Sequence, residues 1–577
     1  MSKKLRIIIA IIVIIILGVA GFFIAKKIEQ ENRKYNIENI SEYNYFVIKE
    51  DNKYGIMDKE GKTIIEPNYD NIKIPNPTKA VFFCYQDDEI IAINDKNEKI
   101  FTEYENVTPL RLKNISSDLM YEKSVLKYKE NEKYGLIDFN GEKITKAIYD
   151  EIDTLQFKEG ELLVKSKEKY GVINIKGHIL VKIKYDKVEV DKYYSSKGNY
   201  KEAGYIVCNT TNEGYRYGYV NTNGKKIIET KYNDLYRVTD IQSKDIYIIA
   251  ADNGKYGMFK NNKQVIKNDY QSLVYNSENN LVTALKGKKY GVITLEEKVI
   301  IPFQYNQIDV TGRYIYATES NEKVVVFDNQ GKESDIDENT AIINVQDTNY
   351  EIYIKSTNDS TTYSIYEDSK KKTNKSYTYI EYLYNGYFIA CNSNNKIGII
   401  DSDENIKVDF KYDSMRKIEN TTIVEFIDDS TKNSYFYSKD TKQVAQMKNA
   451  VVENENNYIK IYNNQDRIYL STDGQAIEYT DIKPNNELYA KKQNGKWGFV
   501  NSKGNKIINY EYDFVTELNQ YGFAGIQKDG KWGIINKEGK IIVNPIYELT
   551  KEKEPNFIGK YYEATYGNGE IYYSDMK

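Results

Sequence analysis

The amino-acid sequence predicts an all-β fold built from about 14 tandem antiparallel β-meander repeats. One pattern recurs: a basic residue, an aromatic residue, Gly, two apolar residues, Asn or Asp, two variable positions, Gly, an apolar pair, and Tyr before an acidic or polar residue. Fourteen copies between Gly55 and Gly533 give a mean period of about 37 residues. Tyrosine dominates the aromatic residues, with 56 Tyr against 19 Phe and 2 Trp, and it favours strands. No useful helical periodicity interrupts the copies.

The N-terminus predicts a membrane anchor. Residues 1–6 are basic and form a predicted cytoplasmic tail, and residues 7–25 are an uninterrupted run of nineteen apolar residues. As a helix this run is about 28 Å long, enough to span a bilayer. Because it continues past Gly18 and Ala20, a retained transmembrane helix is favoured over a cleaved signal peptide, which stays the alternative. Residues 26–40 are polar and predict a stalk. A long domain behind such an anchor is usually translocated, so we expect the body to be extracytoplasmic.

The body divides by how well the copies keep the pattern. WG-type repeats of a first group cover residues 41–320, degenerate repeats cover 321–485, and the last two clear copies cover 486–549. Residues 550–577 predict a truncated terminal repeat. The clear copies are 53–72, 133–152, 169–188, 216–235, 255–273, 289–308, 396–415, 496–515 and 531–549.

Each part of the pattern predicts a local structure. In KWGFVN (496–501), apolar residues alternate on both faces, which indicates a strand covered on both sides. Glycine inside a strand indicates that a neighbouring backbone or ring comes too close for a Cβ. The following Asn/Asp-x-x-Gly predicts a hairpin turn. Pro67, Pro302 and Pro545 mark a strand that is an edge or near its end. Each repeat therefore has three or four strands.

Two arrangements of these repeats fit the sequence. Propeller-like blades are favoured, and an open β-solenoid is the alternative. Either needs the terminal segment 550–577, as closing strands for a ring or as a cap over an exposed end. In a propeller this segment is expected to pair with strands distant in sequence, and in a solenoid with the preceding unit only.

The aromatic-Gly positions form the predicted structural core of the repeats. Trp497 and Trp532 are expected to be core residues and not ligand contacts. The full set is Tyr54, Gly55, Tyr134, Gly135, Tyr170, Gly171, Tyr217, Gly218, Tyr256, Gly257, Tyr290, Gly291, Gly398, Trp497, Gly498, Trp532 and Gly533.

Composition argues against several functions. The net charge is −4 with both signs interspersed, so no basic surface for nucleic acid is expected. Cys84, Cys208 and Cys391 are far apart and predict buried thiols rather than disulfides or metal ligands. His178 is the single histidine, which leaves no His-based zinc site or acid/base pair. We expect no catalytic residues, no metal and no cofactor.

Two loops resemble ligand-binding motifs but fail in detail. Gly55 and Gly61 are separated by five residues where a phosphate-binding loop has four, and the segment predicts a hairpin. The acidic segment from Asp401 has Ile406 and Tyr412 where a calcium loop needs Gly and Glu. Both are interpreted as hairpin turns.

The Trp497-Gly498 and Trp532-Gly533 pairs and their surrounding pattern resemble the WG-repeat family of bacterial proteins. Seven of the nine clear copies differ by having Tyr or Ile at the Trp position. The resemblance implies a propeller-like β-repeat architecture, often attached to secretion or membrane segments, whose repeats act as interaction modules. It implies no defined catalytic activity.

The leading functional hypothesis is therefore a membrane-anchored scaffold that binds another protein through an extended repeat surface. A module that binds an envelope glycan is the alternative, and a hydrolase with a carboxylate pair is a weaker one. Tyrosines outside the pattern are candidates for a sugar-stacking or protein-binding surface, with simple surface exposure as the equal alternative. They are Tyr193, Tyr194, Tyr200, Tyr205, Tyr379, Tyr382, Tyr384 and Tyr387.

Overall fold

The computed structural model describes most of the chain after its N-terminal segment. The described residues are 34–577 except 88, 114–118, 157, 192–203, 223, 239–244, 337–338, 358–359, 456, 484–485, 550–553, 566–570 and 576–577. The predicted tail 1–6, the predicted transmembrane helix 7–25 and part of the predicted stalk lie outside them. Within the described ranges, no helix has the length and apolar character needed to cross a bilayer. The one helix there is α2 (Tyr479–Ile482).

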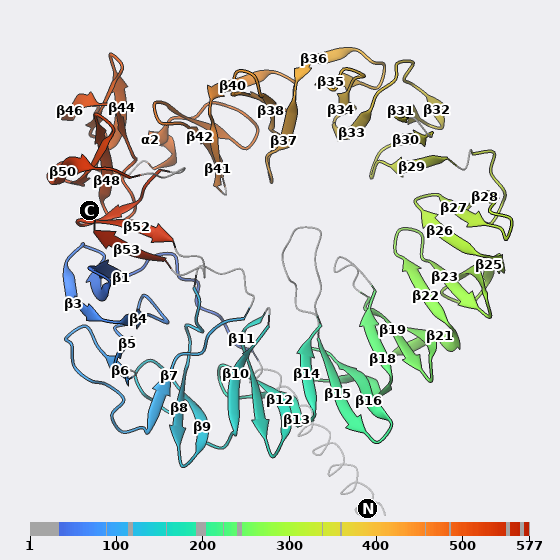
Figure 1. Ribbon diagram of the computed structural model, residues 1–577, viewed down its shortest axis with the longest axis horizontal. Helices are drawn as coiled ribbons and strands as arrows, with labels where there is room; N and C mark the ends of the chain where they lie inside the picture. The colour runs from blue at the N-terminus through green and yellow to red at the C-terminus, as the bar shows by residue number, and fades with distance from the viewer. Residues whose placement is uncertain are drawn as a thin grey trace, which may run out of the picture. The chain divides into compact units, whose positions relative to one another are not determined.

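The described chain is almost entirely β-structure, arranged in fourteen sheets, which confirms the all-β prediction and the number of repeats. It divides into two compact units. Unit 1 comprises residues 1–271 and 563–575, and unit 2 comprises residues 272–562 and 576–577. Figure 1 shows the strands of each unit gathered into small sheets that follow one another along the chain.

Unit 1 contains six of the sheets. Their strands are β1 (Tyr45–Glu50), β2 (Lys53–Asp58), β3 (Thr63–Tyr69); β4 (Asn71–Lys73), β5 (Phe82–Gln86), β6 (Glu89–Ile93); β7 (Asn106–Thr108), β8 (Leu126–Glu130), β9 (Lys133–Ile137); β10 (Glu151–Leu155), β11 (Lys158–Ser166), β12 (Lys169–Asn174), β13 (Ile179–Tyr185); β14 (Lys187–Val190), β15 (Tyr205–Thr211), β16 (Gly214–Val220), β17 (Lys226–Tyr232); and β18 (Asp234–Arg237), β19 (Tyr247–Asp252), β20 (Lys255–Lys260), β21 (Lys263–Tyr270).

Unit 2 contains the other eight sheets. Their strands are β22 (Ser272–Asn276), β23 (Leu281–Lys286), β24 (Lys289–Thr294), β25 (Val299–Tyr305); β26 (Gln307–Thr311), β27 (Tyr314–Thr318), β28 (Val324–Asp328); β29 (Thr340–Asn344), β30 (Tyr350–Ser356), β31 (Thr361–Glu367), β32 (Lys370–Lys371); β33 (Tyr379–Tyr384), β34 (Tyr387–Cys391), β35 (Ile397–Asp401), β36 (Ile406–Tyr412); β37 (Ser414–Lys417), β38 (Val424–Asp428), β39 (Asn433–Tyr437), β40 (Gln443–Lys448); β41 (Val451–Glu455), β42 (Tyr458–Tyr462), β43 (Arg467–Ser471); β44 (Tyr489–Gln493), β45 (Lys496–Val500), β46 (Lys506–Tyr512); and β47 (Phe514–Val515), β48 (Phe523–Lys528), β49 (Lys531–Asn536), β50 (Ile541–Tyr547). The chain ends with β51 (Phe557–Ile558), β52 (Tyr561–Thr565) and β53 (Ile571–Asp575).

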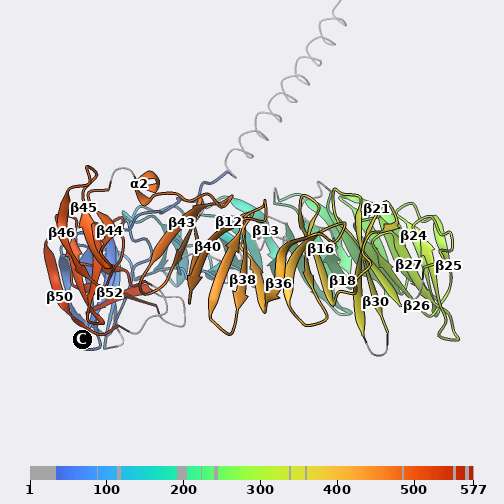
Figure 2. The same cartoon turned by 90° about the horizontal axis from the view of Figure 1, so that it is seen from above.

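Apart from the sheet that contains β1 and β53, each sheet is an antiparallel meander in which strands pair with their neighbours in sequence. In the sheet β10-β11-β12-β13, the last strand ends at Tyr185, and the next sheet begins with β14 only two residues later. Figure 2 turns the view by 90°, and β44, β45 and β46 again lie side by side. This propeller-like arrangement agrees with the favoured prediction of blades.

The glycine of the pattern faces a β-bulge in the last strand of its sheet. Tyr170 pairs with Tyr185 and Val172 pairs with Val181, so two residue steps on β12 oppose four on β13. A Cβ on Gly171 would lie 2.6 Å from the carbonyl oxygen of Val181, too close for any side chain. The bulge therefore requires glycine.

The hairpin after this strand has the predicted geometry. In the copy at 169–188, Gly177 has φ +78° and donates its N–H to the carbonyl of Asn174 at 2.8 Å. The side-chain oxygen of Asn174 accepts the N–H of His178 at 3.0 Å. The hairpins at Gly61 and Glu404 are also closed onto an aspartate four residues before the turn ends, Asp58 and Asp401. Both loops that resembled ligand motifs are therefore hairpin turns.

The C-terminal strand β53 pairs with the first strand of unit 1. Ile48 pairs in parallel with Tyr573, and the rings of Phe46 and Tyr573 make an edge contact at 5.3 Å. The end of the chain thus pairs with a strand distant in sequence, as expected for closing strands in a propeller.

Candidate functional site

The predicted core residues occupy one position in every clear copy. The Tyr side chains of the Tyr-Gly pairs are half-buried, and Trp497 and Trp532 are each only 7% exposed. The pattern's last Tyr is more deeply buried, as at Tyr185, Tyr305 and Tyr412, although the sequence analysis gave it no role.

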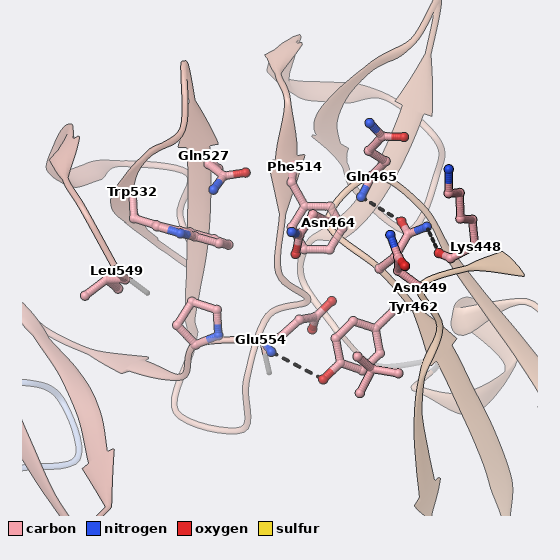
Figure 3. A pocket seen from close by; sticks show the side chains of 13 residues that line it. Lys448, Asn449, Tyr462, Asn464, Gln465, Phe514, Gln527, Trp532, Leu549 and Glu554 are labelled. Atoms are coloured by element: carbon pink, nitrogen blue, oxygen red, sulfur yellow. Dashed lines mark hydrogen bonds between the residues drawn. The ribbon is translucent and has the colours of Figure 1, made fainter. Parts of the chain in front are cut away.

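A pocket of about 680 Å³ lies in unit 2, where the two copies that contain Trp end (Figure 3). Its volume is within the range of small-ligand pockets. The lining residues are Lys448, Asn449, Val451, Tyr462, Asn463, Asn464, Gln465, Phe514, Gln527, Trp532, Leu549, Glu554 and Pro555.

One wall of the pocket is a row of side chains in register across three strands. Phe514 of β47 pairs with Gln527 of β48, and Gln527 pairs with Trp532 of β49. Residues directly opposite one another in a sheet share a face. The ring centroids of Phe514 and Trp532 are 6.3 Å apart in an edge arrangement. Trp532 is therefore a buried core residue that also lines the pocket.

The opposite wall is the turn between β42 and β43. Asn463 is fully used in holding this turn: its amide donates to the carbonyl of Lys448 at 2.9 Å, and its oxygen accepts the N–H of Gln465 at 2.8 Å. The indole N–H of Trp497 donates to the carbonyl of Gln465 at 3.0 Å. These bonds fix the backbone that presents the neighbouring amide side chains.

Four amide side chains at the pocket have no hydrogen bond within the described chain. Asn449, Asn464 and Gln465 are exposed, and Gln527 is half-buried. Each side-chain amide offers two N–H donors and an acceptor oxygen. The pocket therefore presents neutral groups that can both donate and accept.

A buried ionic network lies under the pocket. Arg467 donates to Glu554 Oε1 at 2.7 Å and to Glu517 Oε1 at 2.8 Å, and Lys460 pairs with the other oxygen of Glu554. The side chain of Arg467 is 1% exposed. The backbone N–H of Glu554 donates to the Tyr462 hydroxyl at 3.3 Å (Figure 3).

The two carboxylates of this network differ in pKa. Burial disfavours the charged form of Glu554, but Arg467 and Lys460 outweigh it and hold its pKa below the usual value. Burial raises the pKa of Glu517 above its usual value despite the same arginine. Both carboxylates are engaged in ion pairs with Arg467.

A second buried ionic cluster lies in unit 1, at the start of β11. Lys158 pairs with Glu161 at 3.0 Å, and the Tyr205 hydroxyl donates to the same carboxylate. Tyr35 of the predicted stalk donates to Glu161 at 2.9 Å, so this part of the stalk packs against the unit. Tyr205 is fully buried, which removes it from the candidate surface tyrosines.

The other candidate tyrosines are placed as follows. Tyr379 is 39% exposed, whereas Tyr382, Tyr384 and Tyr387 are half-buried. Tyr193, Tyr194 and Tyr200 lie outside the described residues.

Two of the three cysteines are buried as predicted, and the third is not. Cys84 and Cys208 are buried, and burial raises the pKa of Cys84 to about 12. Cys391 is half-buried and His178 lies in a hairpin turn. No set of three or more potential metal ligands occurs among the described side chains.

The pocket lies between the last two copies of the repeat and the degenerate part of the chain. Five stretches match the family model for the WG containing repeat. They are residues 54–75, 170–192, 217–256, 497–532 and 532–551. These stretches include both copies with Trp, and four of the pocket residues, Phe514, Gln527, Trp532 and Leu549, lie within them.

Solved structures similar to this chain include the following three. A crystal structure of the eukaryotic initiation factor is 9% identical, covers 56% of this chain and 96% of its own, and has a TM-score of 0.30. The WD40 beta propeller domain of Doa1 is 11% identical, with coverages of 42% and 90% and a TM-score of 0.17. PorZ, a surface component of the type-IX secretion system of Porphyromonas gingivalis, is 9% identical, with coverages of 87% and 73% and a TM-score of 0.16. No curated protein matches the chain.

The sequence analysis missed the pocket. Its amide wall comes from Asn463-Asn464-Gln465 in the turn between β42 and β43. The other lining residues include Lys448, Asn449, Val451, Leu549, Glu554 and Pro555. The three consecutive amide residues at this turn were the one sequence feature that could have indicated a polar binding site. Their position opposite Gln527 depends on the packing of separate sheets.

Proposed function

We propose that this chain is a membrane-anchored, extracytoplasmic β-repeat scaffold that binds a partner protein. The WG repeats and the series of small sheets support a binding role, because repeats of this kind present extended surfaces. The observation that carries the proposal is the pocket of unit 2, which is lined by four amide side chains that form no hydrogen bond within the described chain. Glu554, which also lines the pocket, forms ion pairs with Arg467 and Lys460.

Binding of an envelope glycan is the second candidate, because aromatic residues and amides occur together in the pocket. Sugar rings stack on exposed aromatic faces. Trp532 is 7% exposed, and Phe514 and Tyr462 are each 3% exposed, so little ring surface is available. These exposures favour the protein partner.

The proposal includes no enzymatic activity, metal or cofactor. The weaker alternative of a carboxylate-dependent hydrolase needs two carboxyl groups that reach a substrate. Glu517 and Glu554 are the nearest pair to the pocket, and both are held by Arg467. Nucleic acid is also excluded from the proposal, because the net charge of −4 gives no attraction for phosphates.

Placement in the membrane rests on the apolar run 7–25. Protease added to intact cells should digest the body if the domain is extracytoplasmic. Protection until lysis, in cells whose envelope admits the protease, would place the body on the cytoplasmic side.

Affinity purification of the full chain, run in parallel with a glycan array, tests the functional proposal. We expect a protein partner to be retained by the wild-type chain and lost from a variant with the pocket filled by Asn464→Trp. Binding of glycans at micromolar strength, with no protein recovered, would support the second candidate instead.

A further inference from the structure

The side chains around the pocket indicate which part of a partner protein it holds. Gln527 lies in register between Phe514 and Trp532, where the two rings restrict its access to water. It makes no hydrogen bond within the described chain. A partly buried side-chain amide contributes most to the free energy of binding when the ligand supplies both a hydrogen-bond donor and an acceptor.

The facing turn offers matching groups. Asn464 and Gln465 extend from a backbone fixed by Asn463 and by the indole of Trp497. Four hydrogen bonds made by the side chains of Asn463 and Trp497 hold this backbone in place. Binding of a ligand therefore costs little conformational entropy in the turn. The amides of Asn449, Asn464, Gln465 and Gln527 thus line a preformed site (Figure 3).

The charges and apolar residues narrow the ligand further. Glu554 is neutralised by Arg467 and Lys460, so no free carboxylate attracts a cation. Trp532, Leu549 and Pro555 form an apolar side of the pocket. Lys448, which is exposed and forms no ion pair among the described side chains, adds one positive charge to the lining. The ligand should therefore combine donor and acceptor groups, including an oxygen that faces Lys448, with an apolar branch.

We propose that the pocket binds an extended peptide segment of the partner protein. Each peptide unit carries one N–H donor and one C=O acceptor, which is the complement of a side-chain amide. The four amides pair with the peptide backbone, and one apolar side chain of the peptide enters beside Trp532, Leu549 and Pro555. This inference rests on the proposed protein-binding function and adds the site and the recognised chemical group.

Selection from a phage library of random short peptides, with the full-length chain in detergent as bait, provides the probe. Binding of a selected peptide is then measured by calorimetry. We expect Asn464→Ala and Gln527→Ala each to weaken it about tenfold. Asn464→Trp, which fills the pocket from an exposed position, should abolish it. Gln330→Ala removes an exposed amide from a hairpin turn of another sheet in unit 2 and should change nothing.

The outcomes separate this inference from the function on which it rests. If selected peptides bind equally to the wild-type chain and to Asn464→Trp, the peptide site is elsewhere and the inference fails. If the partner protein is retained by both while no short peptide is selected, the inference fails and the scaffold function stands. If only glycans bind, and Asn464→Trp abolishes that binding, both proposals fall.

Discussion

Lys496 and Asp513 form an ion pair at 2.5 Å that also connects two successive sheets of unit 2. The second oxygen of Asp513 accepts the backbone N–H of Asp529 at 2.7 Å, in the hairpin between β48 and β49. The same arrangement joins a lysine, the aspartate seventeen residues later and a backbone N–H in or next to a hairpin of the following sheet in four other copies. We call it the Lys–Asp clamp. The clamps are Lys53–Asp70–Asp87, Lys133–Asp150–Lys167, Lys169–Asp186–Thr210, Lys396–Asp413–Asp429 and Lys496–Asp513–Asp529.

Asp513→Ala removes an ion pair and a hydrogen bond and should destabilise unit 2 by about 1 kcal/mol. The expected effect is small because the side chains of Lys496 and Asp513 are each more than one-third exposed. Thermal unfolding of the purified chain measures the loss. Asp409→Ala is the matched control, since this aspartate is exposed and has no clamp. An equal effect of the two substitutions would remove the clamp as a stabilising element.

The clamps predict how stability depends on pH. The hydrogen bond from the lysine lowers the pKa of each clamp aspartate below its ordinary value of 3.8. A lowered folded-state pKa gives stability that is present above the unfolded pKa and lost as the pH falls through the folded pKa. The stability difference between the wild type and Asp513→Asn should therefore be present at about pH 6 and shrink below about pH 3.5. A difference that is constant over this range would show that ionisation of Asp513 does not contribute.

Gly498→Ala should destabilise the chain by about 1–3 kcal/mol. A Cβ there would lie 2.6 Å from the carbonyl oxygen of Ile508 in the bulged strand β46. Gly495→Asn is the control, because this glycine has φ +80° with no atom near the missing Cβ, and Asn tolerates that conformation. Urea unfolding compares the two. Equal stability of Gly498→Ala and the wild type would mean that the bulge can relax.

Arg467→Met should destabilise unit 2 by about 3–5 kcal/mol, because it leaves Glu554 and Glu517 buried without their shared cation. Glu517→Gln added to this variant removes the carboxylate that has lost its cation, since Glu554 keeps Lys460, and should recover part of the loss. Chemical unfolding of the single and double variants gives the comparison. If the second substitution only adds to the damage, Arg467 acts through packing and not through its charge.

Much of the fold could be predicted because each copy of the pattern contains the turn residues and the apolar alternation that determine its strands and hairpins. The hairpin at Gly177 and the strand at KWGFVN follow from turn residues and alternation. The bulge could be inferred only in part: glycine indicated a close neighbour, but the neighbour is the carbonyl of Val181, which lies in the next strand. In the degenerate copy that lacks this glycine, β39 and β40 pair without such an offset from Asn433 to Phe436.

The pocket could not be predicted because it depends on contacts between segments with no common pattern. Asn464 and Gln527 are more than sixty residues apart and meet only through the packing of neighbouring sheets. The Lys–Asp clamp could be predicted only in part. Both its residues belong to the pattern, but their pairing could be inferred only once the strand order was known. No sequence motif indicated that Glu554 pairs with Arg467 and Lys460.

The most direct measurement of the central claim is site-specific photo-crosslinking from the pocket in intact cells. A photoreactive phenylalanine analogue is placed at position 464, and at the control position 330, in the full-length chain. The account predicts a crosslinked product at position 464 that protease shortens to a peptide adduct, that a selected peptide suppresses by competition, and that is missing at position 330. Equal products from both positions, or an adduct at position 464 that resists protease and is removed by glycosidases, would contradict it.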